Sequence, residues 1–164
     1  MIRRATEQDR SWVLETIERE WHGPLIERAD EFVDVRTLEV DIAYLGDEKV
    51  GLSTLLIEED FIEIITINSF REGQGVGTAL IEAAKKEGQK RNLKDLRLFT
   101  TNDNLHALAF YQKRGLRLWA IHRDTMTRAR LSKPRIPLQG SSGIRIMDEI
   151  ELRLDLTAET PRPR

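Results

Sequence analysis

A glycine-rich turn, where a strand passes into a helix, limits the fold of this chain more than any other feature. Residues 61–67, FIEIITI, are rich in β-branched side chains and predict a strand, whereas residues 75–91 carry apolar side chains at helical spacing. Gly73, Gly75 and Gly77 lie at the junction between them. Glycine tolerates backbone conformations that other residues avoid, and the first N–H groups of a helix lack partners within it. The junction therefore predicts main-chain N–H groups that converge on one point, as binding of a pyrophosphate requires.

The segments on either side of this turn predict an α/β (α+β) fold. Antiparallel strands are expected over residues 38–45, 50–58 and 61–67, because short polar turns join these runs of β-branched and aromatic residues. Further strands are expected at 1–5, 96–100, 116–122 and 150–156, and helices at 11–21, 75–91 and 105–114. These elements fit a mixed, mostly antiparallel central sheet of about seven strands with helices on both faces. Residues 129–147, rich in proline, glycine and serine, predict a long loop.

Length and charge indicate one domain that binds neither nucleic acid nor membrane. We place the domain at residues 1–156 and expect a disordered tail at 157–164. The 26 basic and 28 acidic residues nearly balance, so nothing in the charge favours nucleic acid as a partner. No apolar run approaches the roughly 20 residues of a membrane span. The start, MIRRATEQDR, also lacks the apolar core of a signal peptide, so we expect a cytoplasmic protein.

The cysteine and histidine content narrows the chemistry. The absence of cysteine excludes disulfides, thiolate metal sites and a cysteine nucleophile. Three histidines are present, His22, His106 and His122, and no two are four residues apart as on one face of a helix. We therefore expect no metal site.

Two common phosphate-binding motifs do not account for the glycine-rich turn. A mononucleotide P-loop ends in Gly-Lys-Ser/Thr, whereas this run ends in Gly77-Thr78-Ala79 and has no lysine. A dinucleotide-binding turn follows GxGxxG, but Thr78 occupies the third glycine position and the preceding strands look like a meander. The turn could also be only a tight connection between a strand and a helix.

A second motif makes the first one specific. The segment NLHALAFYQKRGL, residues 104–116, carries Asn104, Ala107, Tyr111 and Gly115 at the spacing N-x-x-A-x-x-x-Y-x-x-x-G-F, with leucine in place of the final phenylalanine. With the upstream turn, it resembles the GNAT superfamily of N-acetyltransferases, whose acetyl-CoA loop follows Q/R-x-x-G-x-G/A. The two glycines of that loop are matched, but its first position holds Glu72 in this chain.

This resemblance implies acetyl-CoA as the co-substrate and an amine of a small molecule or protein as the acceptor, which would attack the thioester directly. Main-chain groups of Ile65, Thr66 and Ile67 would pair with the pantetheine arm, as an added strand does. Asn104 would hydrogen-bond the same arm, and Tyr111 would act as the general acid that protonates the leaving thiolate. The N–H groups facing the pyrophosphate would come from Gly73, Gln74, Gly75, Val76, Gly77 and Thr78. Taken without the motif, Tyr111 is also compatible with a core position beside Phe110.

The general base is left open by the sequence. Glu63 lies on the strand before the glycine-rich turn, where several members of the superfamily place a catalytic glutamate; burial beside Ile62 and Ile64 would raise its pKa. An equally good interpretation is a strand residue that faces solvent. His22 is the alternative base, because an imidazole transfers protons at neutral pH. A glutamate that some members carry on the next strand is replaced by Phe99.

The acceptor cannot be identified from the sequence. The first helix, the residues after it and the loop 129–147 would build the acceptor pocket, and His122 could line it. Apolar residues in the late strands suggest a homodimer. Because the base is unassigned and Glu72 departs from the motif, a non-catalytic acyl-CoA sensor or interaction domain of the same fold is the alternative function.

Overall fold

The computed structural model describes residues 1–158 and contains a seven-stranded sheet in the order β1-β4-β5-β6-β7-β9-β8. The strands in that order are β1 Ile2–Arg4, β4 Glu39–Leu45, β5 Glu48–Ile57, β6 Phe61–Ser69, β7 Asp95–Thr101, β9 Glu149–Asp155 and β8 Arg117–His122. Every neighbouring pair is antiparallel except β6 and β7, which are parallel. The predicted fold class, with its mixed, mostly antiparallel sheet, is confirmed.

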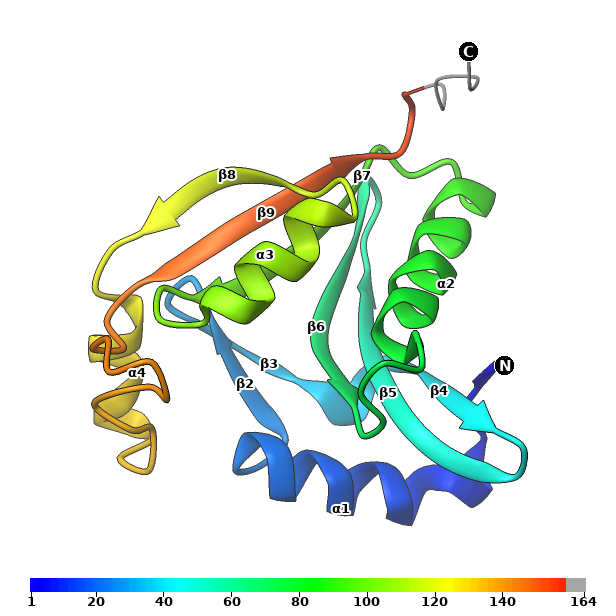
Figure 1. Cartoon of the computed structure of the whole chain (residues 1–164), viewed down its shortest axis with the longest axis horizontal. Helices are drawn as coiled ribbons and strands as arrows, with labels where there is room; N and C mark the ends of the chain where they lie inside the picture. Colours follow the sequence, from blue (N-terminus) through cyan, green and yellow to red (C-terminus); the bar gives the residue numbers. More distant parts are fainter. Residues whose placement is uncertain (159–164) are drawn as a thin grey trace.

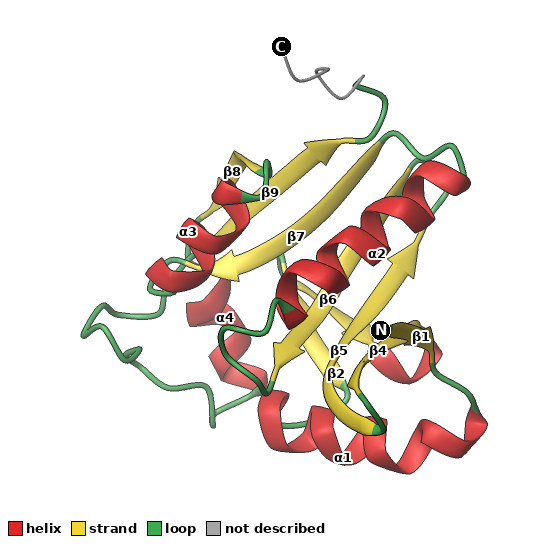
Figure 2. Cartoon of the chain, turned by 45° about the vertical axis from the view of Figure 1, so that its right-hand side comes forward, coloured by secondary structure: helices red, strands yellow, loops and turns green. Residues whose placement is uncertain are grey.

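Helices cover both faces of the sheet (Figures 1 and 2). The helices are α1 Arg10–Trp21, α2 Val76–Lys90, α3 Leu105–Lys113 and α4 Thr125–Ser132, with 3-10 turns at Glu7–Asp9 and Val35–Thr37. On one face, Ile81 of α2 and Tyr111 of α3 pack on sheet residues in one apolar cluster. On the other face, Val13 and Ile17 of α1 join a second cluster. These two clusters fix the sheet between its helices.

Two elements were not predicted from the sequence. Residues 25–34 form a separate hairpin from β2 Leu25–Arg28 and β3 Glu31–Asp34, which share one two-stranded sheet. The loop expected at 129–147 is wrong in its first part, because α4 Thr125–Ser132 extends into it. Of the tail predicted to be disordered, residues 157 and 158 are exposed, and residues 159–164 lie outside the described part of the chain.

The strands β6 and β7 pair along only part of their length. Their register joins Phe61–Ile64 to residues 95–98, and each strand then continues without the other. A β-bulge at the same level shifts the β5–β6 register between Thr54 and Leu55, so that Ile65 has no partner on β5. A bulge bends its strand and increases the twist. The middle of the sheet is therefore open beyond Ile64, on the edge of β6 that faces β7.

Residues 1–158 contain no helix that is both long enough and apolar enough to cross a lipid bilayer.

Candidate active site

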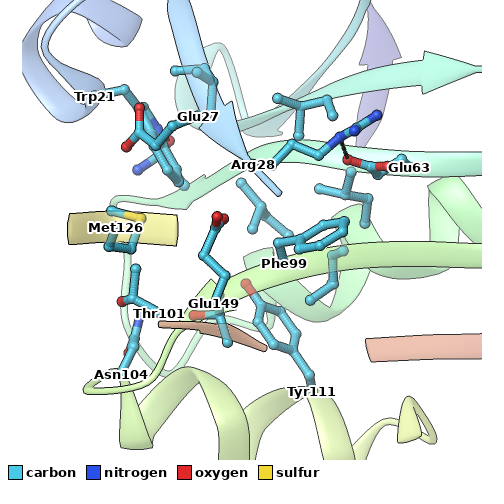
Figure 3. Close-up of a pocket in the computed structure, with 17 residues that line it drawn as sticks. Trp21, Glu27, Arg28, Glu63, Phe99, Thr101, Asn104, Tyr111, Met126 and Glu149 are labelled. Carbon is cyan, nitrogen blue, oxygen red and sulfur yellow. Dashed lines mark hydrogen bonds and ion pairs between the residues drawn. The ribbon is translucent and has the colours of Figure 1, made fainter. Parts of the chain in front are cut away.

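A cavity of about 270 Å³ lies where β6 and β7 separate. Its walls come from the end of α1, the β2–β3 hairpin, both parting strands, α3, α4 and the start of β9 (Figure 3). It brings together three polar residues singled out from the sequence, Glu63, Asn104 and Tyr111. These residues are far apart in the chain, and the opening in the sheet is what lets their side chains meet.

Tyr111 belongs both to the core and to the cavity. Its ring is 9% exposed and packs edge-on against Phe110, with ring centroids 5.7 Å apart. The hydroxyl group points into the cavity (Figure 3). Because burial disfavours the phenolate, the pKa of Tyr111 rises to about 12. The hydroxyl thus keeps its proton at neutral pH and is available as a donor.

Glu63 is buried on the cavity side of β6, 2% exposed, and does not face solvent. Its carboxylate forms an ion pair with Arg28 of the hairpin, Nε to Oε2 2.6 Å (Figure 3). Burial raises the pKa of Glu63 to about 7, because desolvation of the carboxylate outweighs the attraction of Arg28. A carboxyl group with a pKa near neutrality can both accept and release a proton in the working pH range.

The glycine-rich turn leaves main-chain groups open at the start of α2. Gly75 caps the helix in the left-handed conformation, with φ 72°, and Gly73 has φ 70°, both of which glycine adopts without strain. The turn from residue 71 to 75 is exposed, and the first turn of α2 contains no acidic residue. The positive end of the helix is thus free to face an anion.

The turn and Tyr111 are held together by close packing of α2 on α3. A Cβ atom on Gly77 would lie 2.9 Å from Cζ of Phe110, the residue next to Tyr111, so only glycine fits there without displacement. Arg114, at the end of α3, donates from Nε to the Thr78 hydroxyl at 2.8 Å. This places a guanidinium group beside the first turn of α2. Arg114 could not be recognised from the sequence, because its position depends on how the two helices pack.

The three strand residues expected to bind through their main chain are not equivalent. Ile65 and Ile67 line the cavity. Thr66 does not, and its N–H donates to the Thr54 hydroxyl on β5 at 3.1 Å, on the side away from the opening. The expectation for Thr66 is therefore corrected, since alternate residues of a strand direct their main-chain groups to opposite sides.

Asn104 lines the cavity from just outside α3. It is the N-cap residue, and its side-chain oxygen accepts the Ala107 N–H at 3.1 Å. Capping uses the oxygen and leaves the side-chain NH₂ group as the donor toward a ligand.

The histidines lie outside the cavity lining. His22 is an exposed residue that ends α1 with φ 62°, and it does not reach the cavity wall, which removes the geometric basis for a role as base. His122 pairs with Glu151, Nε2 to Oε1 3.1 Å, and does not line the cavity as expected. His106 is exposed.

Glu149 is a cavity residue that the sequence did not single out. It opens β9, is 4% exposed, and extends its carboxylate into the middle of the cavity (Figure 3). Burial raises its pKa above the ordinary range of a glutamate. In the sequence it is only the residue before a predicted strand.

A model of the acetyltransferase (GNAT) family matches residues 5–116, which is more than half of the chain. The chain belongs to the GNAT family of acetyltransferases. The matched range includes the glycine-rich turn and the helix that carries Tyr111, which are the two segments meeting at Gly77. The resemblance inferred from the two motifs is confirmed.

Similar proteins are found among curated sequences and among solved structures. The chain is 50% identical over 107 residues to the uncharacterized protein YxbD of Bacillus subtilis (strain 168), covering 65% of this chain and 67% of that protein. A Bacillus subtilis acetyltransferase in complex with CoA has a TM-score of 0.71 at 23% identity, covering 94% of this chain and 97% of that one. A GNAT family acetyltransferase from Elizabethkingia anophelis with acetyl-CoA bound has a TM-score of 0.71 at 20% identity, with the same coverage. At these identities the two structures establish likeness of fold.

Proposed function

We propose that this chain transfers the acetyl group of acetyl-CoA to an amine by direct attack on the thioester. The observation that carries the proposal is that Tyr111 and Glu63 reach the same cavity from opposite sides of the opening between β6 and β7. Two solved structures of similar fold hold CoA or acetyl-CoA, which supports the same ligand here. The GNAT family to which the chain belongs supports acetyl transfer as the reaction.

In the proposed complex, the cofactor lies in the opening of the sheet. Ile65 and Ile67 offer main-chain groups to the pantetheine amides in the manner of an added strand, and the Asn104 NH₂ group adds a donor. The pyrophosphate lies at the start of α2, where it accepts N–H groups from residues 73–78 and faces Arg114.

Proton transfer is divided between two residues. The acceptor arrives as an ammonium ion, which has no lone pair, so Glu63 first removes a proton, directly or through a water molecule. The free amine attacks the thioester carbonyl and forms a tetrahedral intermediate. The C–S bond then breaks, and the Tyr111 hydroxyl protonates the departing CoA thiolate. The attached nitrogen loses its second proton, which returns to the tyrosinate directly or through water and leaves a neutral amide and a neutral tyrosine. A pKa of about 12 keeps the hydroxyl proton on the tyrosine until the thiolate forms.

Replacing Tyr111 with phenylalanine separates this proposal from the acyl-CoA sensor. We expect Tyr111→Phe to lower kcat by roughly 10²- to 10⁴-fold, the usual contribution of one general acid. Acetyl-CoA affinity should stay within about twofold, because the hydroxyl acts mainly on the leaving group. Release of CoA, followed with a thiol reagent across a set of amines, gives the rate, and isothermal titration gives the affinity.

Tyr44 provides the matched control, since it is the other of the two tyrosines and lies on β4, outside the cavity lining. Tyr44→Phe should retain wild-type turnover. Binding of acetyl-CoA without CoA release for any amine would favour the sensor, and absence of binding would reject both functions.

We further propose a cytoplasmic homodimer. The edge strand β8 exposes Leu118, Trp119 and Ile121, and an exposed apolar edge of this kind is suited to association. Light scattering of the purified chain, compared with a Trp119→Glu variant, tests this surface.

A further inference from the structure

The cavity contains three glutamates whose surroundings differ. Glu63 is paired with Arg28. Glu27 is paired with Lys133, Oε2 to Nζ 2.9 Å. Glu149 has no cationic side chain within 4.0 Å of its carboxylate among residues 1–158. One buried carboxylate on the cavity wall thus lacks a counter-ion.

The carboxylate of Glu149 is held by an uncharged donor. Its Oε1 accepts the Ala29 N–H at the turn of the hairpin, at 2.9 Å. The nearby imidazole of His122 is directed instead to Glu151. Burying an ionised carboxylate without a counter-ion is costly, and a cation from a ligand would remove that cost.

Glu149 lies well away from Glu63, the residue assigned as the base. In the sheet, Glu63 is opposite Arg97 of β7, whereas Glu149 is opposite Thr101. Four residues along a strand separate these levels by roughly 13 Å. A cationic group bound at Glu149 is therefore a different group from the amine that reacts beside Glu63.

Three of the residues that line the cavity have large apolar side chains. Trp21, Phe99 and Met126 all line the cavity and suit an aliphatic chain (Figure 3). The volume of about 270 Å³ is close to the lower end of ligand cavities, roughly 300–1,000 Å³, which favours a small acceptor.

We infer that Glu149 selects acceptors that carry a second positive charge, so that the substrate class is a small aliphatic amine with an additional ammonium group. This inference rests on the proposed function. One ammonium group binds at Glu149, the alkyl chain packs on the apolar side chains of Trp21, Phe99 and Met126, and the other amine reaches the thioester. Glu149 acts on acceptor specificity and takes no part in proton transfer.

The test compares cadaverine with pentylamine, which share a five-carbon chain and differ in the second amine. For the wild-type chain, KM for cadaverine should be lower than KM for pentylamine by roughly ten- to hundredfold, the loss expected for a hydrogen bond to a charged group. Glu149→Gln, which keeps the shape and removes the charge, should raise KM for cadaverine by the same factor. It should leave KM for pentylamine and the affinity for acetyl-CoA unchanged.

Glu151→Gln is the matched control. Glu151 lies two residues further on the same face of β9, is similarly buried at 6% exposure, and pairs with His122 and Arg153 outside the cavity lining. It should leave the ratio of the two KM values unchanged. Circular dichroism and thermal unfolding of each variant confirm that it is folded.

Three outcomes would overturn the inference while leaving the acetyltransferase proposal intact. These are equal KM values for the two amines in the wild type, equal increases in KM for both amines in Glu149→Gln, or a changed ratio of the two KM values in Glu151→Gln.

If no CoA is released with either amine, isothermal titration of both amines into the CoA-saturated wild type and Glu149→Gln tests the inference instead. Tighter binding of cadaverine that depends on Glu149 supports the inference, and no such preference rejects it.

Discussion

The buried carboxylate of Glu63 makes the stability of this protein depend on pH in a way that one substitution can isolate. Its pKa is about 7 in the folded chain, against an ordinary value of 4.5. Between these two pH values the folded state keeps a proton that the unfolded state has released. Unfolding therefore releases a proton, and the free energy of unfolding falls as the pH rises from about 4.5 to 7.

The size of this effect follows from the pKa difference. Each pKa unit corresponds to about 1.4 kcal/mol. A change from 4.5 to about 7 thus corresponds to a loss of about 3 kcal/mol across the window. Glu63→Gln cannot titrate and should lack this dependence. Below about pH 7 the folded wild type carries a neutral Glu63, which the glutamine resembles, so the ion pair to Arg28 is lost from the comparison only as Glu63 ionises.

Urea denaturation of the wild type and Glu63→Gln at half-unit steps from pH 4.5 to 8.5 measures the difference directly. Subtracting one curve of unfolding free energy against pH from the other cancels the contributions of the other titrating groups, including Glu149. The same ionisation should appear in catalysis, with wild-type kcat rising up to about pH 7 and this limb absent from the slow variant. Two parallel stability curves would refute the argument that burial controls this carboxyl group.

Two further substitutions test the packing around the site. Gly77→Ala should lower the free energy of unfolding by about 1–2 kcal/mol, because the clash with Phe110 exceeds the gain in helix propensity. In a Phe110→Leu background the same change should be neutral or stabilising. An equal decrease in the free energy of unfolding in that background would contradict the clash. Lys133→Met removes the partner of Glu27 and two hydrogen bonds to main-chain carbonyls, so we expect a loss of about 3 kcal/mol in urea denaturation. Lys113→Met, an exposed control, should have no effect.

The two motifs allowed much of the fold and the cofactor side of the site to be predicted from the sequence. Gly75 is needed by local geometry, a left-handed cap, whereas Gly77 is needed by the contact of its helix with Phe110, and both requirements are visible in the residue type. Tyr111 follows at a spacing set by one helix. The cap and the helical spacing are local requirements and leave a local pattern.

The acceptor side could not be predicted, because it is assembled from distant segments without such a pattern. The hairpin turns through Ala29 and Asp30, with φ 48° and 66°, where sequence rules expect glycine or asparagine. Helix α4 has no distinct apolar stripe, and its N-cap Asp124 adopts φ 62°. Glu149 acquires its surroundings only when the hairpin turn and α4 pack beside it.

The short pairing between β6 and β7 has a consequence for the protein in the cell. Within residues 1–158, backbone pairing joins the two halves of the sheet directly only from Phe61 to Ile64, and packing of side chains holds the rest. A molecule that fills the opening and contacts both halves stabilises the folded state, by about 2.7 kcal/mol at a hundred times its dissociation constant. Under the proposed function, the lifetime of the polypeptide against proteolysis would follow the supply of acetyl-CoA.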